Sequence, residues 1–135
     1  MSLFKPELVR VQVLTTYLPS HSQPEDEQYT FAYTITIRNG SDEAVQLLSR
    51  HWIITDANDE VQEVRGEGVV GEQPVIPPGE QFRYTSGATL HTPIGCMEGN
   101  YTMIVANSTA IDPSEQPAFE VPIPPFTLHT PTALH

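Results

Sequence analysis

Three glycines form the most specific chemical pattern in the sequence, because Gly66, Gly68 and Gly71 have Gly-x-Gly-x-x-Gly spacing. In a dinucleotide-binding fold, that spacing lets a loop hold pyrophosphate at the N-terminus of a helix. The proline-rich segment that follows cannot begin a helix, so we do not expect that fold. Two interpretations stay open. In the first, backbone N–H groups of the loop hold a phosphate beside Arg65. In the second, the glycines permit a bulged, closely packed strand connection.

Acidic and amide side chains at residues 56–60 resemble the opening of a calcium-binding loop, with oxygen atoms at alternate positions. An EF-hand loop needs glycine where this sequence has Val61, and the chain then enters a strand-like segment. A hairpin turn rich in Asp and Asn explains the same residues. We therefore expect no dedicated metal site and no cofactor.

Ser49, His51 and Asp56 are the only grouping that suggests a hydrolase. Side chains two apart in a strand stand about 7 Å apart, which is too far for a hydrogen bond between a nucleophile and its base. Cys96 has no adjacent base. The sequence therefore predicts no catalytic residues, and we expect a protein that is not an enzyme.

The charge balance limits the classes of partner. Lys and Arg number 6 against 17 Asp and Glu, a formal net charge of -11, so binding to nucleic acid or a membrane surface is not expected. The only cysteine is Cys96, and neither a signal peptide nor a membrane-spanning apolar stretch is present. These features indicate a cytoplasmic protein, expected as a monomer or a weak homodimer.

Alternation of apolar and polar residues predicts strands throughout the chain and no helix. It is clearest in residues 29–38. Residues 45–55 are apolar on both faces, which predicts a central strand with Leu47 on one face and Trp52, a core anchor, on the other. Neither Pro122 nor Pro124 can donate a backbone hydrogen bond, so we expect the strand at 119–123 to lie at a sheet edge or to leave that side unpaired.

About seven strands separated by turns predict an all-β immunoglobulin- or fibronectin type III-like sandwich of antiparallel strands. No linker, repeat or boundary divides the chain. We therefore expect one domain over residues 1–135, with extended tails at 1–6 and 129–135.

Longer motifs give a family resemblance. The sequence closely resembles the ApaG family at YTFAY (29–33), VQLLSRHW (45–52), EVRGEGVVGEQP (63–74), YTSG (84–87), TPIGCMEGNY (92–101) and VPIPPF (121–126). The resemblance implies a bacterial protein with a fibronectin-type sandwich and a link to cobalt resistance and magnesium efflux. It also implies protein recognition, because similar domains are attached to a ubiquitin-ligase subunit and to a protein that interacts with DNA polymerase. The stretch 107–117 is longer and more polar than the family's expected hairpin.

Two functions follow as hypotheses. The first is a non-enzymatic protein-binding domain that uses an exposed strand edge, or the loop from Gly66 to Pro74 together with Arg50 and Arg65. The second is a sensor that binds pyrophosphate or a nucleotide polyphosphate, with or without a divalent cation, at the glycine loop. The identity of the protein partner does not follow from the sequence.

Overall fold

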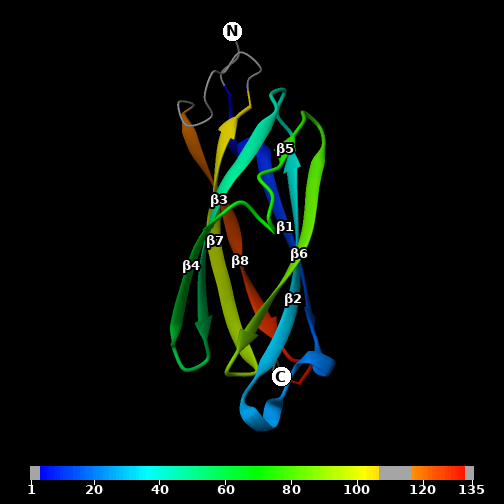
Figure 1. Cartoon of the computed structure of the whole chain (residues 1–135), viewed down its shortest axis with the longest axis vertical. Helices are drawn as coiled ribbons and strands as arrows, with labels where there is room; N and C mark the ends of the chain where they lie inside the picture. The colour runs from blue at the N-terminus through cyan, green and yellow to red at the C-terminus, as the bar shows by residue number, and fades with distance from the viewer. Residues whose placement is uncertain (1–3, 107–116, 133–135) are drawn as a thin grey trace.

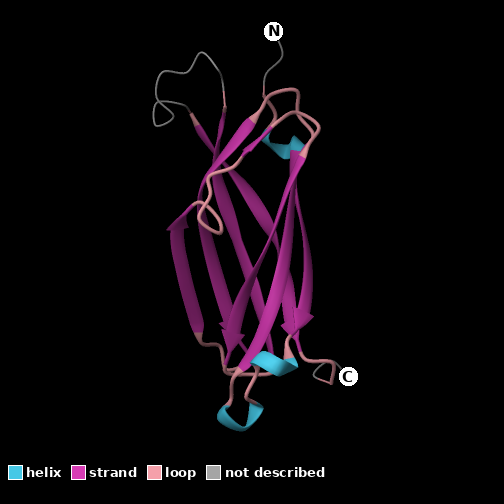
Figure 2. Ribbon diagram, turned by 45° about the vertical axis from the view of Figure 1, so that its right-hand side comes forward, coloured by secondary structure: helices cyan, strands magenta, loops and turns pink. Residues whose placement is uncertain are grey.

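The computed structural model describes residues 4–106 and 117–132, so most of the polar stretch at 107–117 lies outside the described residues. Strands account for most of the described chain, and the helical elements are three short 3-10 turns (Figure 2). In chain order the elements are η1 (Pro6–Leu8), β1 (Val9–Tyr17), η2 (Pro19–His21), η3 (Pro24–Asp26), β2 (Tyr29–Asn39), β3 (Val45–Asp56), β4 (Val61–Glu67), β5 (Val75–Ile76), β6 (Gln81–Leu90), β7 (Ile94–Val105) and β8 (Ala118–His129).

The strands form two antiparallel sheets that face each other (Figure 1). One has the order β1-β2-β6; the other has the order β4-β3-β7-β8, with β5 paired to β3. This confirms the predicted all-β sandwich, whereas its likeness to fibronectin type III stays a prediction. β8 lies at a sheet edge, as Pro122 and Pro124 predicted.

The core lies between the sheets, and β2 contributes alternate residues to it. Phe31, Ile35 and Ile37 of β2 are fully buried, and Trp52 is 2% exposed, which confirms it as a core residue. The indole packs edge-on against Tyr33 and Phe126, with ring centroids 5.4 and 5.9 Å away. Such aromatic pairs stabilise a core beyond the area that they bury.

The prediction that Leu47 and Trp52 lie on opposite faces of the strand is wrong. Both belong to the core. The pairing of β3 with β7 shifts register between Leu47 and Ser49, so Leu48 forms a bulge. Because a bulge inserts one extra residue, the alternation changes phase there, and the two core residues come from positions of opposite parity.

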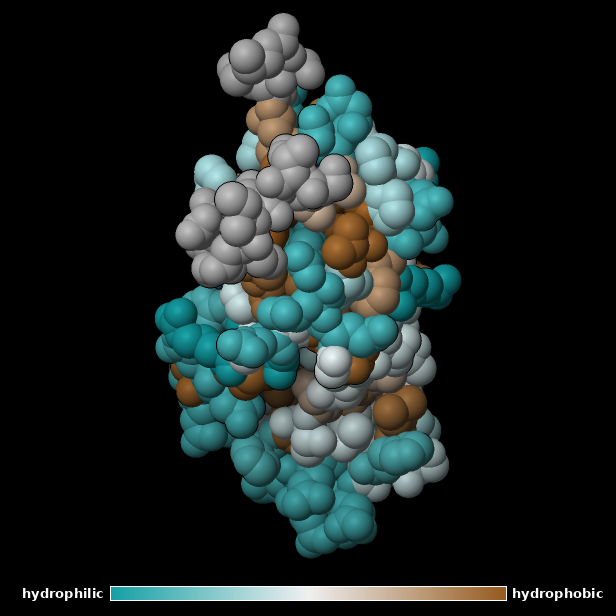
Figure 3. Space-filling model, turned by 45° about the horizontal axis from the view of Figure 1, so that its top comes forward, coloured by the Kyte–Doolittle hydropathy of each residue, from teal (hydrophilic) through white to brown (hydrophobic). Residues whose placement is uncertain are grey.

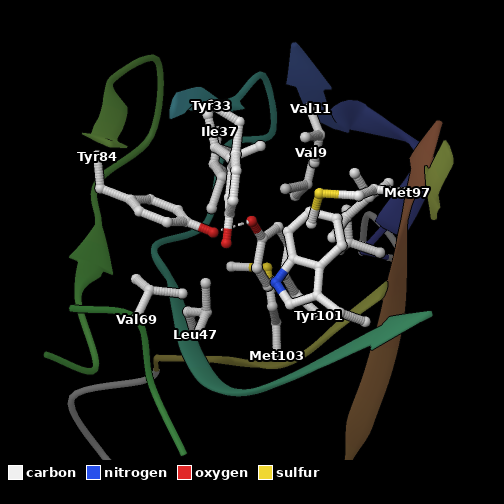
Figure 4. Close-up of a cluster of buried hydrophobic side chains, with 14 of the residues drawn as sticks. Val9, Val11, Tyr33, Ile37, Leu47, Val69, Tyr84, Met97, Tyr101 and Met103 are labelled. Atoms are coloured by element: carbon white, nitrogen blue, oxygen red, sulfur yellow. Dashed lines mark hydrogen bonds between the residues drawn. The ribbon is translucent and has the colours of Figure 1, made fainter. Parts of the chain in front are cut away.

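Two buried tyrosines meet in this core. The hydroxyl groups of Tyr84 and Tyr101 hydrogen-bond to each other and point toward one another beside Tyr33 (Figure 4). Burial raises the pKa of both phenols, because a phenolate would lose its hydration. Tyrosines in the unfolded chain ionise near the ordinary value of 10.0. The neutral pair therefore contributes its full stabilisation to the folded state below about pH 10. This contribution declines as the pH rises above that value.

We predict that the free energy of unfolding falls steeply above pH 10 in the wild type, and less steeply in the double variant Tyr84→Phe, Tyr101→Phe. The double variant removes both ionisable groups and leaves no hydroxyl without its partner. Urea denaturation followed by far-ultraviolet circular dichroism at a series of pH values measures both slopes. Equal slopes would contradict the assignment of the alkaline loss to this pair.

The two sides of the sandwich differ. Along one side β1 and β8 are in contact, and near the start of the chain Phe4 packs on Phe119 with ring centroids 4.8 Å apart. On the other side, grooves lined by residues of both strands separate β4 from β6. At the far end of β8, the backbone N–H of Thr130 donates to Pro93 O at 3.0 Å. Residues 1–3 and 133–135 of the expected tails lie outside the described residues.

Candidate functional site

The glycine motif spans the end of β4 and the turn that follows. Val69 and Glu72 exchange backbone hydrogen bonds of 2.8 and 2.9 Å. Between them Val70 has φ 44° and Gly71 has φ 82°. Positive φ at both central residues defines a type I′ turn, in which glycine at the second position relieves strain. Gly71 is therefore explained by the turn.

The other two glycines permit close packing. Gly68 has φ 63°, and a Cβ there would lie 2.3 Å from Glu72 O. A Cβ on Gly66 would lie 2.8 Å from the guanidinium of Arg50. The Gly68 N–H donates to Leu48 O at 2.8 Å. These contacts support the interpretation of the motif as a closely packed strand connection, and phosphate binding at the loop stays a prediction.

The two arginines assigned to this loop lie on opposite faces of the sheet. Arg50 pairs with Gly66 across the β3–β4 hairpin and donates from Nη1 to the carbonyl oxygens of Glu67 and Gly68, at 3.0 and 2.8 Å. Arg65 pairs with His51, is 72% exposed, and donates from Nη2 to Glu63 Oε1 at 2.8 Å. The structure therefore brings Arg50 together with Gly66 and Gly68, but places the Arg65 guanidinium elsewhere.

Arg65 belongs to a polar cluster on the outer face of the β4-β3-β7-β8 sheet. Glu63 Oε1 also contacts His51 Nε2 at 2.7 Å. The hydrogen bond to His51, followed by the hydrogen bond and charge of Arg65, lowers the pKa of the Glu63 carboxyl. His51 thus engages a glutamate. The Ser49–His51–Asp56 grouping is not assembled, because Asp56 accepts hydrogen bonds from the backbone N–H groups of Asn58 and Glu60.

Those two bonds of 2.8 and 3.0 Å explain the aspartate at position 56. Asp56 closes the β3–β4 hairpin with its side chain, as Asp commonly does in turns. Asp59 has φ 61°, a conformation that Asp tolerates better than most residues. The described residues hold no cluster of three or more His, Cys, Asp or Glu side chains arranged to bind a metal ion.

The opening between β4 and β6 is a feature that sequence reasoning missed. Two grooves meet there, with volumes of about 390 and 230 Å³, and both are lined by Ile54, Gln62 and Thr89. The larger groove also reaches the core residues Tyr33 and Trp52. Only the arrangement of the two sheets brings these residues together, so neither strand pattern nor motif spacing could have identified them.

Comparison with known proteins decides the family. Residues 19–105 match the family model described as the ApaG domain. The chain belongs to the ApaG family. It is 52% identical to Protein ApaG of Dechloromonas aromatica over 94% of each chain, and 54% identical to Protein ApaG of Ralstonia nicotianae over 93% of this chain and 94% of that one.

The ApaG fold is also found among solved structures. A crystal structure described as the putative ApaA protein from Bordetella pertussis superposes with a TM-score of 0.83 at 48% identity, covering 92% of this chain and 94% of that one. The family resemblance drawn from the sequence is therefore confirmed. In the part of the chain that the structure describes, no helix is long and apolar enough to cross a membrane.

Proposed function

We propose that this chain is a non-enzymatic protein-binding domain that accepts an extended segment of a partner along the opening between β4 and β6. The observation that carries the proposal is the pair of sheet edges facing this opening, with a partly apolar groove between them. An extended segment that adds to a sheet edge gains main-chain hydrogen bonds, and pockets beside the edge select its side chains.

The β6 edge suits this role best. The backbone N–H of Asn39 donates to Glu80 O, so the antiparallel pattern directs the backbone groups of Arg83, Thr85 and Gly87 away from β2. Gly87 also lines the larger groove, so its outward backbone groups lie next to the space that a partner strand would occupy. By contrast, the proline-bearing edge of β8 is protected against strand addition.

The groove floor offers apolar contact, and brown hydrophobic atoms are visible between the teal and white atoms of the face drawn in Figure 3. Val64 of β4, Ala88 of β6 and Met97 of β7 line the larger groove, beside the aromatic rings of Tyr33 and Trp52. Apolar atoms that become buried there would stabilise a complex by roughly 25 cal/mol per Å² before the costs of association. A partner segment with apolar residues at alternate positions therefore fits the groove.

The test blocks main-chain pairing and leaves the groove intact. In Gly87→Pro the outward N–H is replaced, and proline is tolerated at a sheet edge. We expect crosslinking and quantitative mass spectrometry of a bacterial lysate to recover a partner with the wild type and with Gly87→Ala, and not with Gly87→Pro. Circular dichroism verifies that each variant is folded. A wild type that recovers nothing above background, even after crosslinking, would overturn the proposal.

The family link to cobalt resistance and magnesium efflux would then act through the partner. The alternative hypothesis, a sensor of pyrophosphate or nucleotide polyphosphate at the glycine loop, is tested by an amide-resolved NMR titration with pyrophosphate, with and without magnesium. Saturable shifts confined to Gly66, Gly68 and Gly71 would favour the sensor. The hydrogen bonds already made within this turn favour silent spectra.

A further inference from the structure

The outer face of the β1-β2-β6 sheet differs in charge from the rest of the chain. The pairing registers direct the even-numbered residues of β1 and β2 and the odd-numbered residues of β6 outward. These positions carry Arg, Gln, Thr, Leu, Ala and Gly, and none carries Asp or Glu. The whole chain, by contrast, has 17 Asp and Glu and a formal charge of -11.

Three of the 6 Lys and Arg residues gather at one end of this face. Arg10 lies directly opposite Arg38, and Arg83 lies opposite Thr36, diagonally next to Arg38. All three side chains are exposed. Among the described residues, the salt bridges involve only His51, Glu63 and Arg65, so none of the three arginines takes part in one.

This arrangement does not serve stability. Like charges directly opposite each other in a sheet are destabilising, and a carboxylate at either position would relieve the repulsion. Glu7 and Glu120 line a groove that Arg10 also borders, yet neither forms a salt bridge with it. The cluster therefore keeps its positive charge available for an anionic group from outside the chain.

The surface next to the arginines is shaped for a partner. Gln12, Leu14, Thr36, Gln81 and Arg83 line a shallow depression with a volume of about 570 Å³. The side chains supply amide, hydroxyl and guanidinium donors, and Leu14 offers an apolar contact because it is 67% exposed. A charged rim around an exposed apolar residue is typical of a protein-binding surface.

We propose that this surface, the arginine face (Arg10, Arg38 and Arg83 with the depression beside them), binds an acidic segment of a partner protein. Arginine recognises carboxylates with two parallel hydrogen bonds, which gives both strength and orientation. The face has no aromatic side chain on which nucleic acid bases could stack. Because the rest of the chain is strongly negative, its other surfaces repel an acidic partner. This repulsion orients the partner toward the arginine face.

The proposal is independent of the β4–β6 opening and can be tested separately. The probe is a short acetylated peptide in which glutamates are interspersed with leucine and serine, titrated into isotopically labelled protein and followed by amide-resolved NMR. We expect saturable shifts at Gln12, Thr36 and Gln81. The variants Arg38→Thr and Arg83→Thr are each expected to weaken binding about 3- to 10-fold.

Arg65→Thr is the matched control, because Arg65 is also an exposed strand arginine but lies on the other sheet. It is expected to leave the peptide affinity unchanged. Thermal denaturation gives a second measurement: Arg38→Thr is expected to raise the Tm by about 1–3 °C, since it removes the repulsion with Arg10. Weaker binding in a variant that is more stable than the wild type cannot be attributed to misfolding.

Three outcomes would overturn the proposal. The first is an absence of shifts on the arginine face with the acidic peptide. The second is an equal loss of affinity in Arg65→Thr, which would indicate unspecific attraction. The third is tighter binding of pyrophosphate or a short single-stranded RNA than of the peptide at this face, which would assign it to a different class of ligand.

Discussion

Replacing Gly99 with alanine is expected to destabilise the fold by about 3–5 kcal/mol, a large part of the roughly 5–15 kcal/mol by which a typical domain is stable. A Cβ at this position would lie 2.0 Å from the backbone carbonyl oxygen of His51, and 3.2 Å from the Cα of Trp52. Both atoms belong to β3, which is paired with β7 along its length. Because backbone cannot rotate away as a flexible side chain can, the two central strands must separate.

Urea denaturation of Gly99→Ala measures this cost, and Gly87→Ala is the matched control. A Cβ at Gly87 meets only Phe31 O at 3.4 Å, which is an ordinary contact. The control should change stability by less than about 1 kcal/mol, in either direction. If Gly99→Ala were as stable as Gly87→Ala, the close approach of β3 and β7 at Gly99 would be wrong.

Trp52→Ala is expected to cost about 3–5 kcal/mol and to abolish partner binding at the β4–β6 opening. The indole fills the centre of the core against Tyr33 and Phe126, and it also lines the larger groove. Its removal leaves a cavity in the core and takes away an aromatic wall of the proposed binding site. One substitution therefore tests both the packing and the groove.

Trp52→Phe separates the two effects. Phenylalanine keeps an aromatic ring in the core, so a loss well below that of Trp52→Ala is expected in urea denaturation. Crosslinking with this stable variant then measures the contribution of the indole to partner recovery. A Trp52→Ala protein with nearly wild-type stability would contradict the central position of this side chain.

Strand positions were predictable because alternation is a local property. The edge position of β8 was predictable for the same reason, since two prolines remove donors regardless of what lies nearby. The bulge at Leu48 was not predictable. Apolar residues on both faces of a segment can indicate a strand that is covered on both sides, and they can equally indicate a bulge that shifts the apolar positions from one face to the other. Only the pairing with β7 distinguishes the two.

The candidate site was harder to predict. The placement of Arg50 and Arg65 on opposite faces could have been predicted from the sequence. A tight turn at Asp56 fixes the hairpin register, and this register pairs Arg50 with Gly66, the neighbour of Arg65. The arginine face required more. Arg10, Arg38 and Arg83 come from three strands, and their proximity depends on the order β1-β2-β6. Sheet order arises from long-range packing, so no local pattern encodes it.

β4 has the smallest share in the core among the long strands. It pairs on one side only, with β3, and most of its residues are exposed. Elements of this kind open locally at a free energy well below that of global unfolding. The edge that flanks the proposed groove is therefore also a part of the sandwich that opens before the core unfolds. A bound segment would bring order to this edge, and the affinity that it shows would include the free energy of closing it.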